Sequence, residues 1–200
     1  RLHLRTGLAT LALLLLSLSA TAQPLAGSEY KWAWTGWERP AGVNPIIEPD
    51  ATSEFMCPMK KIPMKWEESD TFNPAATIFD GKVVVLYRAE DNSATGIGSR
   101  TSRIGYAEST DGLHFTRRGA PVLFPDAGDA EAENEIPGGC EDPRVCMTED
   151  GLYVMMYTQW NRKQARLGVA TSRDLQHWTK HGSPFAKAYG GKFAHVFSKS

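Results

Sequence analysis

Short apolar runs separated by turn-forming residues dominate the chain after residue 72. The runs are rich in β-branched and aromatic residues, and no segment keeps the 3.6-residue period of an amphipathic helix. Asp80-Gly81 and Asp111-Gly112 lie between runs and are strong signals for hairpin turns. The pattern predicts four short strands: Ala75–Phe79, Lys82–Arg88, Ile104–Ser109 and Phe115–Arg117.

The same pattern occurs a second time further along the chain. Arg103–Asp111 matches Arg166–Asp174 at an offset of 63 residues, and Asp80–Tyr87 matches Asp150–Tyr157 at an offset of 70. The second copy predicts four more strands: Val145–Thr148, Leu152–Gln159, Leu167–Ser172 and Trp178–Lys180.

Four strands repeated at a nearly fixed period are typical of β-propeller blades. The sequence therefore predicts an all-β fold, with residues 73–200 forming the first blades of a propeller. Propellers have about 4–8 blades, so two copies cannot close a ring. We expect only about the first half of the domain to lie in this chain. An open β-sandwich is the alternative fold.

The first 22 residues have the layout of a secretory signal peptide. Arg1 and Arg5 form a basic end, Leu8–Leu18 is almost wholly apolar, and Ala20-Thr21-Ala22 supplies a small-x-small cleavage pattern. A membrane anchor is the alternative, but about 11 apolar residues are too few to cross about 30 Å of hydrocarbon. We therefore expect an exported protein, periplasmic or extracellular, with no membrane span after residues 1–22 are removed.

Residues 23–72 are rich in Trp and Pro and show little periodicity. We interpret them as an extended lead-in that packs on the propeller. Packing under loops is the favoured interpretation of their tryptophans, because Trp is usually largely buried, and stacking on a sugar is the alternative. These tryptophans are Trp32, Trp34, Trp37 and Trp66.

Composition and charge narrow the classes of partner. The chain is 42% hydrophobic and 22% charged, with a formal net charge of -1, which is ordinary for a globular protein. It has no Lys/Arg-rich run, so nucleic acid is not an expected partner. It has no metal-ligand spacing and no phosphate loop, so we expect no metal and no cofactor. Cys57, Cys140 and Cys146 are interpreted as buried or incidental thiols, and their pairing stays open.

Polar side chains gather at two kinds of position in the repeat. The first lies just before the first strand of each copy, where Asn73 and Asp142 each precede a proline that stiffens the backbone. The second lies where the second strand of each copy ends. Carboxylates, Arg, amides and an aromatic ring at one mouth suit a polyhydroxylated ligand such as a sugar. The candidate substrate-binding residues are Asn73, Arg88, Glu90, Asp91, Glu141, Arg144, Tyr157 and Gln159.

Other polar residues in the repeat have simpler interpretations. For Glu141–Arg144 the alternative is a turn with local ion pairs, which are common and contribute little energy. Residues that recur at equivalent places in both copies are expected to be structural: Ser109, Ser172, Asp111 and Asp174. The histidines in the same turns are expected to be solvated: His114, His177 and His181.

Four stretches of the chain resemble glycoside hydrolase family 130: Phe72–Ala76, Tyr87–Asp91, Gly138–Arg144 and the Ser-x-Asp-x-x-x-Trp-x-x-x-Gly stretch that ends at Gly182. The resemblance implies a five-bladed β-propeller and an inverting β-mannoside phosphorylase or β-1,2-mannosidase. It implies that Asp142 is the catalytic residue at the scissile sugar. It also implies that Asn73 and Arg88 grip the mannose, with Glu141 and Arg144 framing the pocket.

The resulting hypothesis is an inverting glycosidase that acts on β-mannosides, with β-1,2-linked manno-oligosaccharides of external glycans as the expected substrate. In that branch the resemblance implies two later glutamates, beyond Ser200, that handle the catalytic water. A β-mannoside phosphorylase that releases mannose 1-phosphate, with inorganic phosphate as co-substrate, is the first alternative. A non-catalytic glycan-binding propeller is the second. Export favours hydrolysis, because a sugar phosphate conserves bond energy that is useful inside the cell. Linkage preference and oligomeric state stay open.

Overall fold

A computed structural model describes residues 37–185 of the chain. The expected signal peptide at 1–22, Trp32 and Trp34 lie outside the described residues. The described chain is all-β apart from one four-residue helix, α1 (Ala132–Glu135), which agrees with the predicted class. Its strands are β1 (Asp50–Cys57), β2 (Ile62–Glu67), β3 (Asp70–Phe79), β4 (Lys82–Glu90), β5 (Ser102–Ser109), β6 (Thr116–Arg117), β7 (Gly139–Met147), β8 (Tyr153–Trp160), β9 (Ala165–Ser172) and β10 (Thr179–Gly182).

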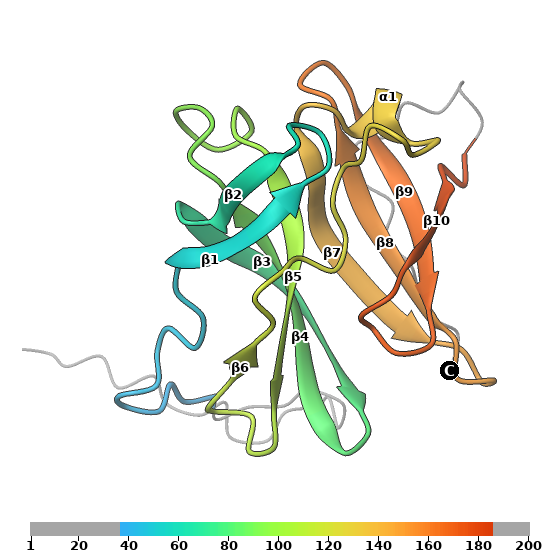
Figure 1. Cartoon of the computed structure of the whole chain (residues 1–200). Helices are drawn as coiled ribbons and strands as arrows, with labels where there is room; N and C mark the ends of the chain where they lie inside the picture. Colours follow the sequence, from blue (N-terminus) through green and yellow to red (C-terminus); the bar gives the residue numbers. More distant parts are fainter. Residues whose placement is uncertain (1–36, 186–200) are drawn as a thin grey trace, which may run out of the picture. The chain divides into compact units, whose positions relative to one another are not determined.

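Most of the described strands belong to two antiparallel meanders of four strands each. Strands β3 to β6 pair in chain order to form the first meander, and β7 to β10 form the second. The meanders lie side by side (Figure 1). They are the two copies that the sequence repeat predicts, and each predicted strand overlaps a strand of the structure.

Both predicted Asp-Gly turns join neighbouring strands, but only Asp80-Gly81 is a tight hairpin, and Asp111-Gly112 lies in a longer loop. Asp80 and Gly81 join β3 to β4 with φ angles of 48° and 73°, the pair of positive values that a type I′ hairpin turn requires. In the loop after β5, the Asp111 side chain accepts hydrogen bonds from the backbone N–H groups of Leu113 and His114. Asp174 makes the equivalent bonds after β9. The recurring Ser and Asp residues therefore stabilise turns, as expected.

The first strand of each meander begins earlier than the sequence predicts. β3 begins at Asp70 rather than Ala75, and β7 begins at Gly139 rather than Val145. The early part of each strand pairs with the second strand of its meander, and a register shift before Ala75 and before Arg144 separates it from the rest. Proline and polar residues at these irregular positions look like loop in the sequence, because proline weakens a strand prediction.

A single parallel pair, Ser102 with Gly139, joins β5 to β7 and so connects the two meanders. A Cβ atom at Gly139 would lie 2.0 Å from the Ser102 carbonyl oxygen, and the glycine has a φ of 109°. Only glycine allows the two backbones to approach this closely. The close approach brings the start of β7 beside the end of β4, where the polar residues gather.

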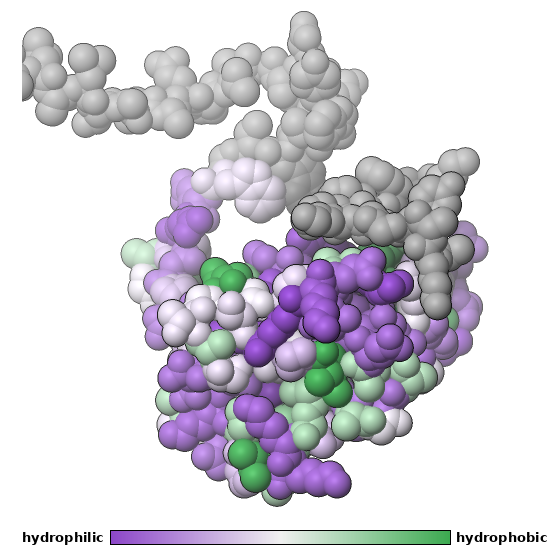
Figure 2. All heavy atoms as spheres, turned by 90° about the horizontal axis from the view of Figure 1, so that it is seen from above, coloured by the Kyte–Doolittle hydropathy of each residue, from purple (hydrophilic) through white to green (hydrophobic). Residues whose placement is uncertain are grey.

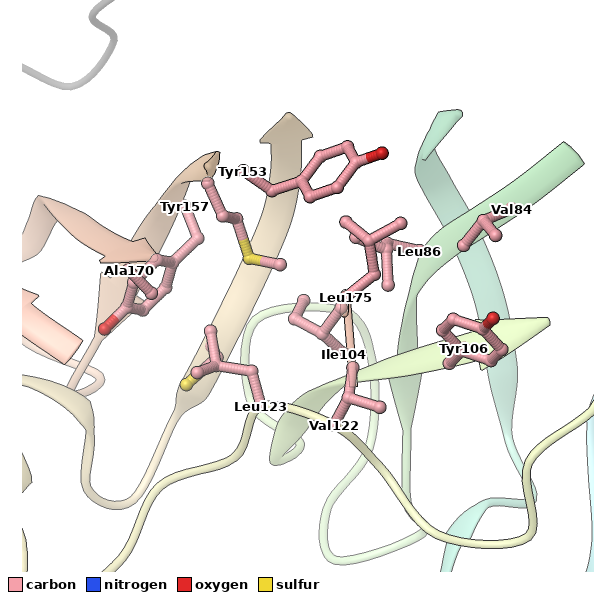
Figure 3. Packing of buried hydrophobic residues seen from close by; sticks show 12 residues of the cluster. Val84, Leu86, Ile104, Tyr106, Val122, Leu123, Tyr153, Tyr157, Ala170 and Leu175 are labelled. Carbon is pink, nitrogen blue, oxygen red and sulfur yellow. The ribbon is translucent and has the colours of Figure 1, made fainter. Parts of the chain in front are cut away.

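The main hydrophobic core lies between the two meanders (Figure 3). Because side chains alternate along a strand, one face of β4 contributes Val84 and Leu86 to this core. From the second meander, Met155 and Tyr157 of β8 pack toward them. The cluster comprises Val84, Leu86, Ile104, Tyr106, Val122, Leu123, Cys140, Tyr153, Met155, Tyr157, Ala170 and Leu175.

The other face of the first meander is covered by a two-stranded hairpin, β1–β2, which the sequence did not predict within residues 23–72. Trp66 of β2 is fully buried against Tyr87 of β4, with the two rings stacked 6.3 Å apart. Its indole N–H donates to the Gly119 carbonyl at 3.1 Å. The packing interpretation is therefore confirmed for Trp66, whereas Trp37, the other tryptophan of this set within the described residues, is 76% exposed. Prolines and a polar turn obscure the alternation of this hairpin in the sequence.

The surface of the described part is largely polar. Figure 2 shows one face on which hydrophilic residues predominate and apolar ones are scattered in small groups. His114 and His177 have 74% and 79% exposed side chains and are solvated, as predicted. The cysteines are unpaired thiols, with Cys57 and Cys140 buried. Within residues 37–185, no helix has both the length and the apolar character needed to cross a bilayer.

Gly105 gives a test of the strand packing. A Cβ atom at this position would lie 2.3 Å from the ring of Tyr87 on the neighbouring strand, so Gly105→Ala should force a shift in β4 or β5. We expect the free energy of unfolding to fall by about 1–3 kcal/mol, as in other overpacked cores. Gly119→Ala is the control, because open space surrounds that Cβ position. Urea unfolding of the full-length gene product measures both, and equal values for the two variants would contradict this packing.

Candidate active site

Two strand irregularities bring Asn73 and Asp142 together. Each residue precedes a proline in the first strand of its meander and has a positive φ, 44° for Asn73 and 50° for Asp142. The residue before a proline avoids helical and left-handed backbone, and Asn and Asp are among the few residues that tolerate the left-handed region. Strain of this kind is concentrated at functional sites. The result is a hydrogen bond from Asn73 Nδ2 to Asp142 Oδ1 of 2.9 Å.

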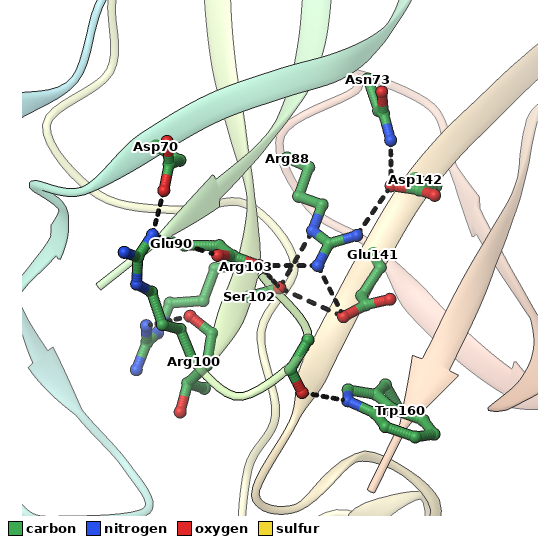
Figure 4. A network of polar contacts seen from close by, with 12 residues as sticks. Asp70, Asn73, Arg88, Glu90, Arg100, Ser102, Arg103, Glu141, Asp142 and Trp160 are labelled. Carbon is green, nitrogen blue, oxygen red and sulfur yellow. Dashed lines mark hydrogen bonds and ion pairs between the residues drawn. The ribbon is translucent and has the colours of Figure 1, made fainter. Parts of the chain in front are cut away.

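Arg88 is the centre of the polar network around this bond (Figure 4). Its Nη1 donates to Asp142 Oδ1 at 3.1 Å. Its Nη2 donates to Glu90 Oε1 at 2.6 Å and to Glu141 Oε1 at 2.8 Å. Its Nε donates to Ser102 Oγ at 3.1 Å. The guanidinium group therefore fixes the positions of three carboxyl groups from two meanders.

Burial and packing hold Arg88 in one position. Its side chain is 5% exposed and its guanidinium carbon lies 4.6 Å from the centre of the Phe72 ring, a cation–π contact. Alternation along β4 places Arg88 on the same face as Leu86, which points toward the second meander. The strand thus directs Arg88 at Glu141 and Asp142 on β7.

A second guanidinium group supports the network from the loop between β4 and β5. Arg100 forms an ion pair with Asp70 at the start of β3, and its Nη1 lies 3.7 Å from Glu90 Oε2. Glu90 is fully buried, and this Oε2 atom has no hydrogen bond within the described chain. Arg88 and Arg100 therefore place Glu90 between two cations, which compensates for the burial of its charge.

Glu141 is the carboxyl group whose acidity changes most clearly in this network. Burial raises the pKa of Glu141 to about 7, and the neighbouring charges of Asp142 and Glu90 add to the increase. The Arg88 guanidinium acts in the opposite direction, to lower this pKa. A carboxyl group that titrates near neutral pH inside a polar cluster is typical of a functional site.

The two oxygen atoms of Asp142 have different surroundings. Oδ1 accepts hydrogen bonds from both Asn73 and Arg88. No described residue donates to Oδ2, and 29% of the side chain is exposed. A proton on this carboxyl group would therefore reside on Oδ2, on the open side. Such an acid can hydrogen-bond a ligand oxygen and transfer the proton to it.

The network described above is called the Arg88 cluster and comprises Asp70, Phe72, Asn73, Arg88, Glu90, Arg100, Ser102, Glu141 and Asp142. Asp91 and Arg144, two of the predicted site residues, lie outside it. Asp91 forms a buried ion pair with Arg103 at 2.9 Å, where Arg103 also lies over the Phe55 ring of β1. Asp91 therefore helps to fix the β1–β2 hairpin. Arg144 is exposed, and its Nη1 donates to the Pro143 carbonyl at 2.7 Å.

Tyr157 and Gln159 lie in a second buried network, also outside the Arg88 cluster. The Tyr157 hydroxyl donates to Glu135 Oε1 at 2.7 Å, and Gln159 Nε2 donates to Glu131 Oε2 at 2.8 Å. Lys180 Nζ lies 2.5 Å from Glu135 Oε2, and this ion pair compensates the charge of the buried carboxylate. This network joins α1 to β8 and β10 and gives Tyr157 and Gln159 a structural role in the described chain.

Several residues of the Arg88 cluster were not predicted from the sequence: Asp70, Phe72, Arg100 and Ser102. Ser102 could have been found, because its counterpart in the second copy is Ala165 and a polar residue that breaks a repeat indicates a specialised role. A hollow of about 350 Å³ lies elsewhere, over the turn after β9, and is lined by Leu152, Thr171, Ser172, Arg173, Asp174, His177 and Thr179. Within residues 37–185, no group of three or more His, Cys, Asp or Glu side chains could hold a metal ion.

Comparison with known proteins gives consistent matches. Residues 42–197 match the family model Glyco_hydro_130, described as beta-1,4-mannooligosaccharide phosphorylase. The chain is 38% identical over 128 residues to the 1,2-beta-oligomannan phosphorylase of Thermoanaerobacter sp. (strain X514), covering 62% of this chain and 41% of that protein.

Two solved structures are similar in both sequence and fold. A glycosyl hydrolase from Bacteroides ovatus matches with a TM-score of 0.77 and 61% identity, over 83% of this chain and 46% of that chain. A structure described as "The GH130 family of mannoside phosphorylases contains glycoside hydrolases that target beta-1,2 mannosidic linkages in Candida mannan" matches with a TM-score of 0.76 and 60% identity, over 82% of this chain and 45% of that chain. The chain thus spans less than half the length of these relatives.

Proposed function

The chain belongs to the Glyco_hydro_130 family, and on that basis we propose that the protein is an inverting glycosidase that cleaves β-mannosides. Its proposed substrates are β-1,2-linked manno-oligosaccharides of external glycans. The observation that carries the proposal is the Arg88 cluster, in which Asn73 and Arg88 hold one oxygen of Asp142 and leave the other on the open side. The 60% identical structure, whose description says that the family contains glycoside hydrolases that target β-1,2 mannosidic linkages, supports the same substrate class.

In the proposed mechanism Asp142 supplies the proton that the leaving sugar needs. Its Oδ2 carries the proton and gives it, directly or through a substrate hydroxyl, to the glycosidic oxygen as the bond to C1 breaks. Arg88 and Asn73 keep the carboxyl group in place and donate hydrogen bonds to the anion that remains. Water attacks C1 from the opposite face, so the β-mannoside yields α-mannose.

The acid–base partner of Asp142 is proposed to lie beyond Ser200. Inverting glycosidases separate their two carboxyl groups by about 6.5–9.5 Å to leave room for the attacking water. Glu90 and Glu141 both accept a hydrogen bond from Nη2 of Arg88. Because Arg88 holds both carboxyl groups, neither is free to activate water. The base is therefore proposed to come from the part of the domain that follows.

The full domain is proposed to be a five-bladed β-propeller in which the two meanders are successive blades. In the first meander Leu86 and Ile104 are buried by the second meander. Their counterparts Met156 and Leu167 are only half-buried, on the face of the second meander that points away from the first. A third meander packed in the same way would bury them. Residues 1–22 are proposed to be a signal peptide that exports the protein.

A β-mannoside phosphorylase is the second candidate function. The family model and the Thermoanaerobacter relative both carry phosphorylase names, which favours it. In that reaction inorganic phosphate replaces water, attacks C1 and forms α-mannose 1-phosphate, while Asp142 protonates the leaving sugar as before. Neither candidate reaction requires a metal or an organic cofactor, and we propose none.

Product analysis separates the two candidates. The full-length gene product is incubated with β-1,2- and β-1,4-linked mannobiose, with and without inorganic phosphate. We expect free mannose from the β-1,2 substrate at the same rate in both buffers. Mannose 1-phosphate formed only with phosphate would contradict hydrolysis and establish the phosphorylase. Tight binding of mannobiose with no product in either buffer would contradict both and leave a glycan-binding propeller.

A further inference from the structure

The Arg88 cluster contains more carboxyl groups than cations. Within the described chain, its ion pairs join Arg88 and Arg100 to Asp70, Glu90, Glu141 and Asp142. If every group were ionised, the negative charges would exceed the positive charges by two. Arg88 and Glu90 have side chains that are only 5% and 0% exposed, so water screens these charges poorly. Like charges in such a place oppose ionisation, and a carboxyl group besides Asp142 is expected to keep its proton.

Glu90 and Asp142 each have support that Glu141 lacks. Glu90 accepts the shortest Arg88 bond, 2.6 Å, and lies between Arg88 and Arg100. Asp142 accepts from Asn73 and Arg88 through Oδ1, and its Oδ2, which carries the proton in the proposed mechanism, has no donor within the described residues. The excess of negative charge therefore acts most strongly on the third carboxyl group.

Glu141 has the weakest support as an anion. Its cation, Arg88, reaches it through Nη2, the nitrogen that also binds Glu90. Its other donor is the Ser102 hydroxyl, which has one hydrogen and lies closer to Glu90, at 3.0 Å, than to Glu141, at 3.3 Å. Its side chain is only 12% exposed. Hydrogen-bond geometry therefore assigns the proton to Glu141.

We infer that Glu141 is a positioning residue that works in its neutral form, by leaving Arg88 free to hold Asp142. The inference rests on the proposed function, in which Asp142 is the proton donor. When Glu141 loses its proton, it competes with Asp142 for the same guanidinium group. The contact of Arg88 with Asp142, 3.1 Å, is the longest of its three ion pairs and gives way first. The carboxyl group that acts on the sugar is then released from one of its two donors.

The surroundings of Glu141 explain the pH at which this happens. The groups that face it are Arg88 and Glu90 from β4, Ser102 from β5 and Asp142 from its own strand, while Arg100 and Asp70 act on it through Glu90. Burial, with the charges of Asp142 and Glu90, raises its pKa to about 7 from 4.5. Between these two pH values the folded protein holds a proton that the unfolded chain has lost. Folding stability from this group is therefore complete below pH 4.5 and is lost as pH rises through 7.

The first test detects the proton itself and needs no turnover. Infrared difference spectra of the full-length gene product are recorded from pH 5 to 9 for wild type, Glu141→Gln and the control Glu108→Gln. Hydrogen bonds from Lys82 and Tyr106 lower the pKa of Glu108, so it does not titrate in this range. We expect a carboxylic-acid C=O signal that disappears with a midpoint near pH 7 in wild type and in Glu108→Gln, and is absent in Glu141→Gln. Wild-type spectra without such a signal would overturn the inference.

The second test uses the pH dependence of mannoside turnover. Gln resembles the neutral acid, so kcat/KM of Glu141→Gln is compared with its own value at pH 6, which separates a change in pH dependence from any loss that the substitution causes at every pH. Above pH 7, kcat/KM of wild type should fall by up to about tenfold per pH unit more steeply than that of Glu141→Gln, because only wild type also loses the Glu141 proton. A purely structural role would instead lower the rate equally at every pH, and a variant whose rate falls as steeply as that of wild type would overturn the inference.

Two further cases are failure of Glu141→Gln to fold and failure of the proposed function itself. If Glu141→Gln does not fold, Ser102→Ala replaces it, because loss of the Ser102 bond, which lowers the Glu141 pKa, should move the infrared midpoint above the wild-type value. An unmoved midpoint would contradict the assignment to Glu141. If the carboxyl signal titrates as expected but no mannoside is turned over, the assignment of the proton stands and the proposed function fails.

Discussion

Replacing Asp142 by Asn is expected to lower kcat on a β-1,2-linked mannoside by about 10²–10⁴-fold, the usual contribution of a general acid. Asn has the shape of Asp and its Oδ1 can still accept from Asn73 and Arg88, so the fold and the affinity for substrate should persist. The amide has no proton to give to the leaving sugar. Steady-state kinetics of the full-length gene product, with binding measured by calorimetry, separate the loss of kcat from any change in affinity.

Asp80→Asn is the matched control for this variant. Asp80 lies in the turn between β3 and β4 with a φ of 48°, a conformation that Asn also tolerates, and it is not part of the Arg88 cluster. The same chemical change there should leave kcat unaltered. If Asp142→Asn retained the wild-type rate, Asp142 would not be the proton donor.

Replacing Arg88 by Met is expected to lower the free energy of unfolding by about 3–5 kcal/mol, because it leaves buried carboxyl groups without their cation. Glu90 is fully buried and Glu141 nearly so, and both bind the same nitrogen of Arg88. Methionine fills much of the volume of the arginine side chain, so the loss of stability reports the missing positive charge rather than a cavity. Chemical unfolding of the full-length gene product in urea measures the change.

Arg173→Met is the control for the Arg88 variant. Arg173 pairs with Asp150 at 3.0 Å, but the two side chains are 61% and 66% exposed. An exposed pair of this kind contributes about 0–1 kcal/mol, so the control should be nearly as stable as wild type. An Arg88→Met protein as stable as the control would show that Arg88 does not stabilise the fold by compensating the charges of the buried carboxyl groups.

The strands and turns of the two meanders could be predicted from the sequence because they repeat. Asp80-Gly81 fixes a hairpin by its backbone preference alone, and Ser109 with Asp111 fixes a turn by local hydrogen bonds. These are short-range effects that the sequence carries directly. The β1–β2 hairpin depends instead on Trp66 packing against Tyr87, a contact between distant strands that no local pattern indicates.

The candidate site was predicted in part, and strand alternation explains which part. Arg88 lies on the same face of β4 as Leu86, toward the second meander, and therefore meets Asp142. Tyr157 and Gln159 were predicted to lie with Arg88 because they are near the end of β8, the equivalent strand of the second copy. Their counterparts in the first copy are Tyr87 and Ala89, which lie on the opposite face from Arg88. Matching the two copies face by face would have assigned Thr158, not its neighbours, to the position of Arg88.

Arg100 and Ser102 were missed because nothing nearby in the sequence indicates their partners. Arg100 contacts Asp70 across a 30-residue separation, and Ser102 contacts Glu141 across 39 residues. Both are placed by the single parallel pair between Ser102 and Gly139, which depends on the close approach of two backbones. Such an approach follows from the packing of the meanders and not from the local sequence.

The most direct test of the account is a crystal structure of the full-length Asp142→Asn protein with β-1,2-mannobiose. Our account predicts that the non-reducing mannose lies against the Arg88 cluster. Its glycosidic oxygen, or a hydroxyl that leads to it, should lie within hydrogen-bond distance of the residue 142 side chain, on the side away from Asn73. A sugar bound elsewhere, with this cluster closed to it, would contradict the assignment of the active site.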